Sequence, residues 1–268
     1  MSFYEFKINN RMYVKSDLFD DKHITHGFTS KLGGVSHGKI SGLNLGFRVG
    51  DDKKSVLENY NFVSKDLSFD LNRAVLSKQT HTDNIRIVTE SDIGKGIMRD
   101  SDIEGTDGLI TNIQNVPLVI FAADCTPILL YDKSNSVIAA VHSGWRGSVK
   151  GIAPKCINLM SDVFGSNPKD IVAAIGPCIG PCCFEFGPEA IDIFPSEYRK
   201  QKPDGKYMID LWAYNRDKMI EAGLSAENID ISRICTACNA DKFYSYRTHK
   251  DKTGRLAGII MLKKTERF

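Results

Sequence analysis

Two apolar stretches decide the fold: Pro117-Leu118-Val119-Ile120-Phe121-Ala122 and Ser136-Val137-Ile138-Ala139-Ala140. Apolar runs of this length, rich in β-branched side chains, predict buried strands. Each run leads into a residue that can bind a metal, because Cys125 follows the first run and His142 follows the second. Strand ends are rigid, so we expect the thiol of Cys125 and the imidazole of His142 to be held in fixed positions.

A third candidate ligand lies upstream, at His81 in Lys78-Gln79-Thr80-His81. Two histidines and one cysteine can bind Zn²⁺ and leave the fourth position open, which is the pattern of a catalytic zinc site. The same residues fit a cysteine hydrolase, with Cys125 as the nucleophile and His142 as the base. A binding module that retains such a site without turnover is a third possibility, since a motif reports geometry and not rate.

Size and composition narrow the class of protein. The chain has 268 residues with no Pro/Ser-rich linker, so we expect one domain over residues 1–268. A net charge of +2 with interspersed signs argues against nucleic acid as a partner, and no stretch reaches the length of a membrane span. The N-terminus lacks the layout of a signal peptide, so we expect a cytoplasmic protein, either a monomer or a homodimer.

Periodicity and turn signals predict the remaining elements. We expect helices over 51–66, 148–164, 188–193 and 210–222, and strands over 74–77, 85–88, 171–175, 229–234, 243–247 and 256–261. Strands and helices alternate only in part, which favours an α/β fold built as a mixed layered sandwich. The glycine-rich stretch 25–52 is either a ligand-contacting loop or an irregular connection.

Seven cysteines in a chain without a signal peptide argue against a disulfide framework. Cys235-Thr236-Ala237-Cys238 has C-x-x-C spacing, but a structural zinc site needs a second pair of ligands. The cysteines at 178, 182 and 183 lie in a Gly/Pro-rich loop that does not match a zinc ribbon. We therefore expect Cys235 and Cys238 to be buried structural thiols, so that replacing Cys235 leaves the zinc content unchanged.

Several motifs, taken in order, resemble one family: the laccase-domain purine nucleoside phosphorylases, once described as multicopper polyphenol oxidoreductases. The resemblance covers nearly the whole chain and rests on matching segments at 26–36, 43–46, 79–81, 106–108, 122–125, 142–147, 175–185, 210–212, 235–236 and 243–247. It implies an α/β/β/α sandwich with zinc held by His81, Cys125 and His142. It also implies phosphorolysis of adenosine, inosine and S-methyl-5′-thioadenosine, with accompanying adenosine deaminase activity.

The copper-oxidase description can be tested by counting histidines. A multicopper oxidase needs about ten histidines and several His-x-His pairs, whereas this chain has six histidines and no such pair. A trinuclear copper cluster is thereby excluded. One copper ion at the zinc trio remains open, because Cu²⁺ binds most nitrogen and sulfur sites more tightly than Zn²⁺.

Phosphorolysis also needs cations to hold the phosphate. The sequence offers Arg48, after the Asn44-Leu45-Gly46 turn, and Arg146, at the start of an expected helix. Asn44 is a candidate for hydrogen bonding to the nucleoside.

Overall fold

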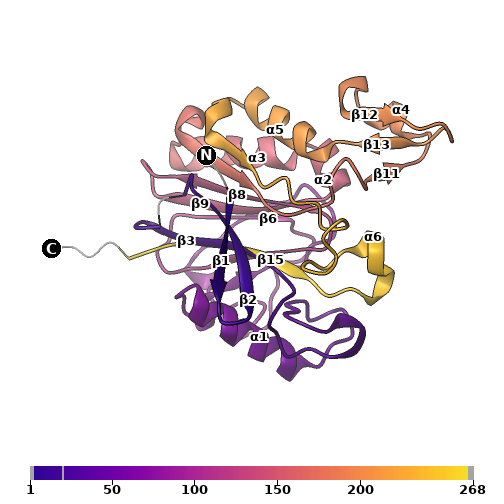
Figure 1. Ribbon diagram of the computed structural model, residues 1–268. Coiled ribbons are helices and arrows are strands. Elements are labelled where there is room, and N and C mark those ends of the chain that lie inside the picture. Colours follow the sequence, from indigo (N-terminus) through magenta and orange to yellow (C-terminus); the bar gives the residue numbers. More distant parts are fainter. Residues whose placement is uncertain (1–2, 20, 265–268) are drawn as a thin grey trace.

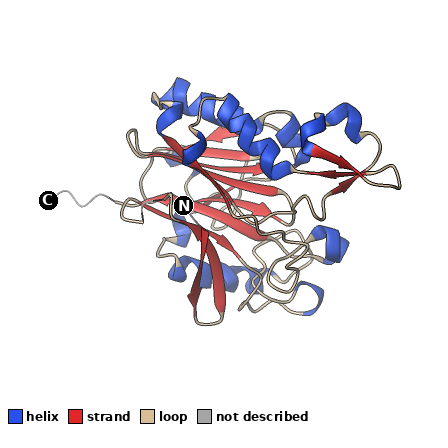
Figure 2. Cartoon of the chain, turned by 45° about the horizontal axis from the view of Figure 1, so that its top comes forward, coloured by secondary structure: helices blue, strands red, loops and turns tan. Residues whose placement is uncertain are grey.

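The computed structural model describes residues 3–19 and 21–264. Two six-stranded sheets pack face to face, and helices cover the outer face of each (Figures 1 and 2). The first sheet has the order β1 (Phe3–Ile8), β2 (Arg11–Ser16), β3 (Ile24–Thr29), β15 (Leu256–Leu262), β7 (Leu118–Ala122) and β4 (Val75–Leu76). The second has the order β14 (Ile229–Ile231), β10 (Ile171–Ile175), β8 (Thr126–Asp132), β9 (Val137–Ser143), β6 (Gly108–Thr111) and β5 (Ile85–Ile87).

Each interface between layers has its own apolar core. Side chains such as Phe28 and Ile120 of the first sheet meet Leu129 and Ile138 of the second. The helix α1 (Lys53–Asp66) packs on the outer face of the first sheet, and α3 (Ile152–Phe164) and α5 (Leu211–Glu221) pack on the outer face of the second. This is the α/β/β/α order that the resemblance implied, so the expected mixed layered sandwich is confirmed.

A small third sheet lies beside α5 in Figure 1. It contains β11 (Glu185–Phe186), β13 (Tyr207–Ile209) and β12 (Arg199–Gln201), with the short helix α4 (Ala190–Ile193) between β11 and β12. Its aromatic side chains form a separate cluster against Trp145. None of the helices in the described part of the chain is both long and apolar enough to cross a bilayer.

Two expected elements differ from the structure. The helix expected over 148–164 is two helices, α2 (Trp145–Val149) and α3, because Gly151 between them has a φ of 75°. The strand expected over 243–247 is wrong: this segment is a turn that leads into the helix α6 (Tyr246–His249). The helix α1 begins after Asp52, whose carboxylate accepts a hydrogen bond from the Ser55 amide.

Candidate metal centre

The three expected ligands lie where the chain crosses from one sheet to the other. Cys125 occupies the turn between β7 of the first sheet and β8 of the second, and His142 lies near the end of β9, opposite Pro127 of β8. The chain brings His81 to the same point from the segment between β4 and β5. The antiparallel β8–β9 pair thus fixes Cys125 and His142 from within the core.

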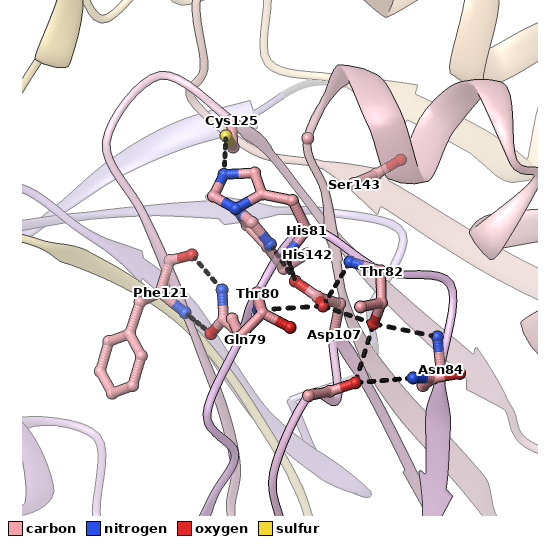
Figure 3. A network of polar contacts seen from close by, with 12 residues as sticks. Gln79, Thr80, His81, Thr82, Asn84, Asp107, Phe121, Cys125, His142 and Ser143 are labelled. Carbon is pink, nitrogen blue, oxygen red and sulfur yellow. Dashed lines mark hydrogen bonds and ion pairs between the residues drawn. The ribbon is translucent and has the colours of Figure 1, made fainter.

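The structure brings the three side chains together (Figure 3). The Sγ of Cys125 lies 3.7 Å from Nε2 of His81, and the two imidazole rings have centroids 5.0 Å apart. One ligand atom from each residue lies within 4.8 Å of the others. Because zinc–ligand bonds are about 2.0–2.3 Å long, one ion can reach all three atoms after small side-chain movements.

Asp107, which follows Thr106 just before β6, supports two of the three ligands. Its Oδ1 accepts a hydrogen bond from the His81 amide at 3.0 Å and lies 2.7 Å from Nδ1 of His142. Its Oδ2 accepts hydrogen bonds from the amides of Thr80 and Thr82, at 3.2 and 2.8 Å. The carboxylate therefore orients the His142 ring, so that Nε2 is free for an ion, and also holds the His81 backbone at its positive φ of 63°.

Members of the trio shift one another's pKa values. Burial would raise the pKa of Cys125, but the charge and hydrogen bond of His142, together with His81, lower it to about 6. Burial would lower the pKa of His142, but the charge of Cys125 and the hydrogen bond with Asp107 raise it to about 9. At neutral pH Cys125 is therefore a thiolate, which is the form of cysteine that binds metals.

Gly144 is required by the close approach of two ligands. A Cβ at this position would lie 2.9 Å from Cδ2 of His81 and 3.1 Å from Sγ of Cys125. The φ of Gly144 is −63°, so its backbone would accept any residue and only the space is restrictive. The His142-Ser143-Gly144 sequence is therefore explained by packing at the centre.

The trio opens into a cavity of about 990 Å³. Its wall includes the aromatic side chains Phe121, Trp145, Phe184 and Tyr246. It also includes four arginines, which are Arg48, Arg99, Arg247 and Arg255, and two lysines, Lys53 and Lys78. A cavity that combines aromatic surfaces, cations and a trio able to hold a metal ion is suited to a ligand with a flat ring and negative charge.

The three residues expected to bind substrate lie in different surroundings. Arg48 lines the cavity, together with Gly46, Phe47 and Val49, so part of the glycine-rich stretch does contact this space. Arg146 is exposed, lies 4.1 Å from the Trp145 ring and does not belong to the cavity lining. The structure thus places Arg146 outside the cavity lining, and its expected part in binding phosphate stays a prediction.

Asn44 is fully buried, and its side chain is occupied by the protein itself. Its Oδ1 accepts hydrogen bonds from the amides of Gly46 and Arg255, and its Nδ2 donates to Gly46 O and to Asp51. These contacts use both ends of the Asn44 amide within the protein, and its expected contact with a nucleoside stays a prediction. Asn44 positions Arg255, which lines the cavity and whose pKa is lowered by burial.

The carboxylate of Asp124, which directly precedes Cys125, has a different part from that of Asp107. Asp124 instead accepts hydrogen bonds from the hydroxyls of Thr236 and Ser245, at 2.6 and 3.0 Å, and from the Arg247 amide at 2.6 Å. These contacts fix a loop from the far end of the chain beside Cys125. Sequence reasoning missed Asp107, Arg247 and Arg255 as site residues, although the first two lie in segments that carried the resemblance.

Comparison with known proteins identifies the family. A family model described as multi-copper polyphenol oxidoreductase laccase matches residues 25–263. The chain belongs to this laccase family. It is 34% identical to purine nucleoside phosphorylase YlmD of Bacillus subtilis, over 91% of this chain and 90% of that protein. It is also 34% identical to adenosine deaminase RL5 of an unknown prokaryotic organism, over 80% of this chain and 85% of that protein.

A solved structure of a laccase-family member supports the fold. The crystal structure of YlmD from Geobacillus stearothermophilus matches with a TM-score of 0.92 at 32% identity, over 98% of this chain and all of that one. The family description mentions several coppers, but the described residues contain two clusters of three or more histidine, cysteine or acidic ligands. One is the trio, and the other consists of four cysteines without histidine.

Proposed function

We propose that the protein is a zinc-dependent purine nucleoside phosphorylase. It would act on adenosine, inosine and S-methyl-5′-thioadenosine with phosphate, and it would also deaminate adenosine. The observation that carries this proposal is the trio of His81, Cys125 and His142 at the floor of an arginine-lined cavity. Relatives named for phosphorolysis and for deamination support the same two reactions.

The donor set fits Zn²⁺ better than other ions. Two imidazoles and one thiolate are ligands that zinc prefers, and three protein ligands leave a position open. Zinc bound by these residues would supply a Lewis acid beside the substrate. Copper at the same trio is the alternative that metal analysis of the purified protein would detect.

The other residues of the cavity have separable parts in phosphorolysis. The reaction forms a bond between a phosphate oxygen and C1′ of the ribose while the C1′–N9 bond breaks, and the purine leaves with a proton. Arg48, Arg247 and Arg255 are our candidates to hold phosphate among the cationic groups of the cavity wall, since the Arg99 guanidinium already donates to the Ser91 and Ile93 carbonyls and Lys78 pairs with Glu104. The aromatic wall offers surfaces on which the purine ring can stack.

We propose the cytoplasm as the compartment, because a reducing environment keeps Cys125 from being oxidised and so leaves its sulfur free to bind the metal.

The proposal is tested with purified, zinc-loaded protein. Inosine and phosphate should give hypoxanthine and ribose 1-phosphate, and adenosine in water should give inosine. Cys125→Ala should lose both activities and the ion of the trio, whereas Cys156→Ala, which removes a buried thiol of α3, should keep them. Zinc-loaded protein that turns over none of these nucleosides would refute the proposal.

A cysteine hydrolase is the second candidate, favoured by the thiolate character of Cys125 beside His142. A nucleophile–base pair does not require a second imidazole, yet His81 also lies 3.7 Å from the sulfur. A covalent acyl adduct on Cys125 in zinc-free protein would favour the hydrolase. Protection of Cys125 from alkylation by zinc would favour the metal site.

A further inference from the structure

Four cysteines gather outside the cavity in a group that the proposed reaction does not use. Cys182 and Cys183 lie in the loop after β10, and Cys235 and Cys238 lie between β14 and α6. We call these four residues the cysteine cluster. The Sγ atoms of Cys182 and Cys183 each lie 3.4 Å from that of Cys238, and all four lie within 4.8 Å of one another.

We propose that the cysteine cluster binds a second Zn²⁺ ion with a structural role. Zinc with four thiolates is tetrahedral with bonds of about 2.3 Å, which separates neighbouring sulfurs by about 3.8 Å. The observed separations bracket this value, so four small side-chain rotations complete the site. Because all four positions are filled by protein, such an ion has no open site for a substrate.

The backbone around the cluster is arranged as in a ligand-supporting shell. The Gly180 amide donates a hydrogen bond to Sγ of Cys235 at 3.2 Å, and the Cys238 amide also donates to this sulfur. Amide hydrogen bonds to a sulfur stabilise its thiolate form and fix its direction. A Cβ at Gly180 would lie 2.7 Å from the Trp212 ring, so this close approach of the loop to Cys235 requires glycine.

The two loops are already joined by backbone contacts next to the cluster. Cys178 and Cys235 form an isolated β-bridge, in which the Cys178 amide donates to Ile234 O and the Thr236 amide donates to Cys178 O. This contact sets the register between segments that are more than fifty residues apart in sequence. The ligands therefore meet because of the fold and not through a flexible tail.

An ion in the cluster would stabilise one wall of the cavity. Ile179 and Phe184, on either side of Cys182 and Cys183, line the cavity, as does Arg247 beyond Cys238. The hydroxyl of Thr236, within the C-x-x-C segment, donates to Asp124, which precedes Cys125. The second ion thus helps to position the loop that carries Arg247, and it takes no part in the proposed phosphorolysis.

This inference replaces the expectation that Cys235 and Cys238 are buried structural thiols. Cys235 is buried, but Cys238 and Cys182 are exposed, and exposed thiols do not contribute to a core. The loop with the second pair of ligands does not have zinc-ribbon spacing, so its partnership with the C-x-x-C segment was not visible in the sequence. Soft thiolate ligands in this number favour Zn²⁺ over hard cations.

The experiment is metal counting on the full chain, purified under anaerobic conditions with zinc. Wild-type protein should contain two zinc ions. Cys182→Ser and Cys238→Ser should each lose the ion of the cysteine cluster and keep the ion of the trio. His81→Ala should lose the ion of the trio and keep that of the cysteine cluster. Cys178→Ser, beside the cluster but outside it, is the matched control and should retain both.

Two further measurements make the result decisive. Cys238→His should retain both ions, because histidine also ligates zinc, which separates loss of a ligand from loss of the fold. Co²⁺-loaded Cys125→Ala protein should show the intense sulfur charge-transfer absorption of a four-thiolate site. The proposal is overturned if the Cys182→Ser and Cys238→Ser variants keep the zinc content of wild type. It is also overturned if the intact mass shows a disulfide within the cluster in the anaerobic protein.

Discussion

Replacing Asp107 with asparagine tests how far the metal trio depends on one carboxylate. Oδ1 of Asp107 serves the His81 amide and His142 Nδ1, and Oδ2 serves the amides of Thr80 and Thr82. Asparagine offers one oxygen for these two sets of donors. Its NH₂ group would face either the Thr80 and Thr82 amides, or the His81 amide and His142.

Both orientations damage the centre. In the first, the partly buried amides of Thr80 and Thr82 lose their acceptor, and the cost in the free energy of unfolding is at most about 1–3 kcal/mol each because water can reach these groups. In the second, the NH₂ group donates to Nδ1 of His142, which moves the ring proton to Nε2 and blocks the atom that faces the ion. Loss of such a supporting partner typically weakens metal affinity by about 10–100-fold, or about 1.4–2.8 kcal/mol.

The assay is competition for zinc against a chromophoric chelator, alongside thermal unfolding of the zinc-free protein. Asp107→Asn should bind zinc at the trio at least about tenfold more weakly than wild type. Asp132→Asn is the matched control, because Asp132 is equally buried and accepts hydrogen bonds from Ser134 and Asn135 at the other end of β8. It should destabilise the fold and leave zinc affinity unchanged. Equal zinc affinity in Asp107→Asn and wild type would refute the reasoning.

Three further predictions concern phosphate, packing and pH. Arg255→Lys should raise the KM for phosphate by about tenfold or more, because lysine cannot bind two phosphate oxygens in one plane. In the same phosphate titration, Arg146→Lys should change this KM far less. Gly144→Ala should lower turnover by roughly tenfold or more, since its Cβ would displace His81 and Cys125, and a normal rate with intact zinc content would argue against that contact. Burial would raise the pKa of Asp92, but hydrogen bonds from Arg86 and Lys95 hold it below 3.8. Asp92→Asn should therefore be less stable than wild type at pH 6, and the difference in unfolding free energy should narrow as the pH falls below 3.8. Urea unfolding at several pH values measures that difference, which would stay constant if the carboxylate charge had no part.

Local patterns in the sequence were enough to predict a mixed layered sandwich, whereas the α/β/β/α order of its layers was implied by the family resemblance. The run at 117–122 forms β7, the run at 136–140 forms most of β9, and the helix expected over 210–222 is α5, which Asp210 caps. These features depend on side chains close in sequence, such as the capping hydrogen bond from the Ala213 amide to Asp210. The break between α2 and α3 at Gly151 was harder to predict, because a glycine near the start of an expected helix can lie within the helix or end it.

The errors arise where distant segments meet. The segment 243–247 contains aromatic residues that favour a strand, but Asp124 binds the Ser245 hydroxyl and the Arg247 amide and holds the chain in a turn. Asp107 supports His142, which lies 35 residues later, and no local spacing indicates that contact. The cysteine cluster likewise joins residues 55 and 56 positions apart.

The position of the trio between the two sheets separates metal binding from substrate binding. Cys125 and His142 depend on the core pairing of β8 and β9 and on the Asp107 carboxylate, so changes in the loops that carry the arginines should leave the ion in place. Arg247 and Arg255 depend instead on loop contacts, through Asp124 and Asn44 respectively. Asp124 adjoins Cys125 and has a positive φ of 83°. The turn that contains both residues therefore directs the Cys125 sulfur toward the trio and the Asp124 carboxylate toward the loop that carries Arg247. Substitutions in those loops should therefore alter the KM for phosphate before they alter zinc content, whereas substitutions around Asp107 should have the reverse effect.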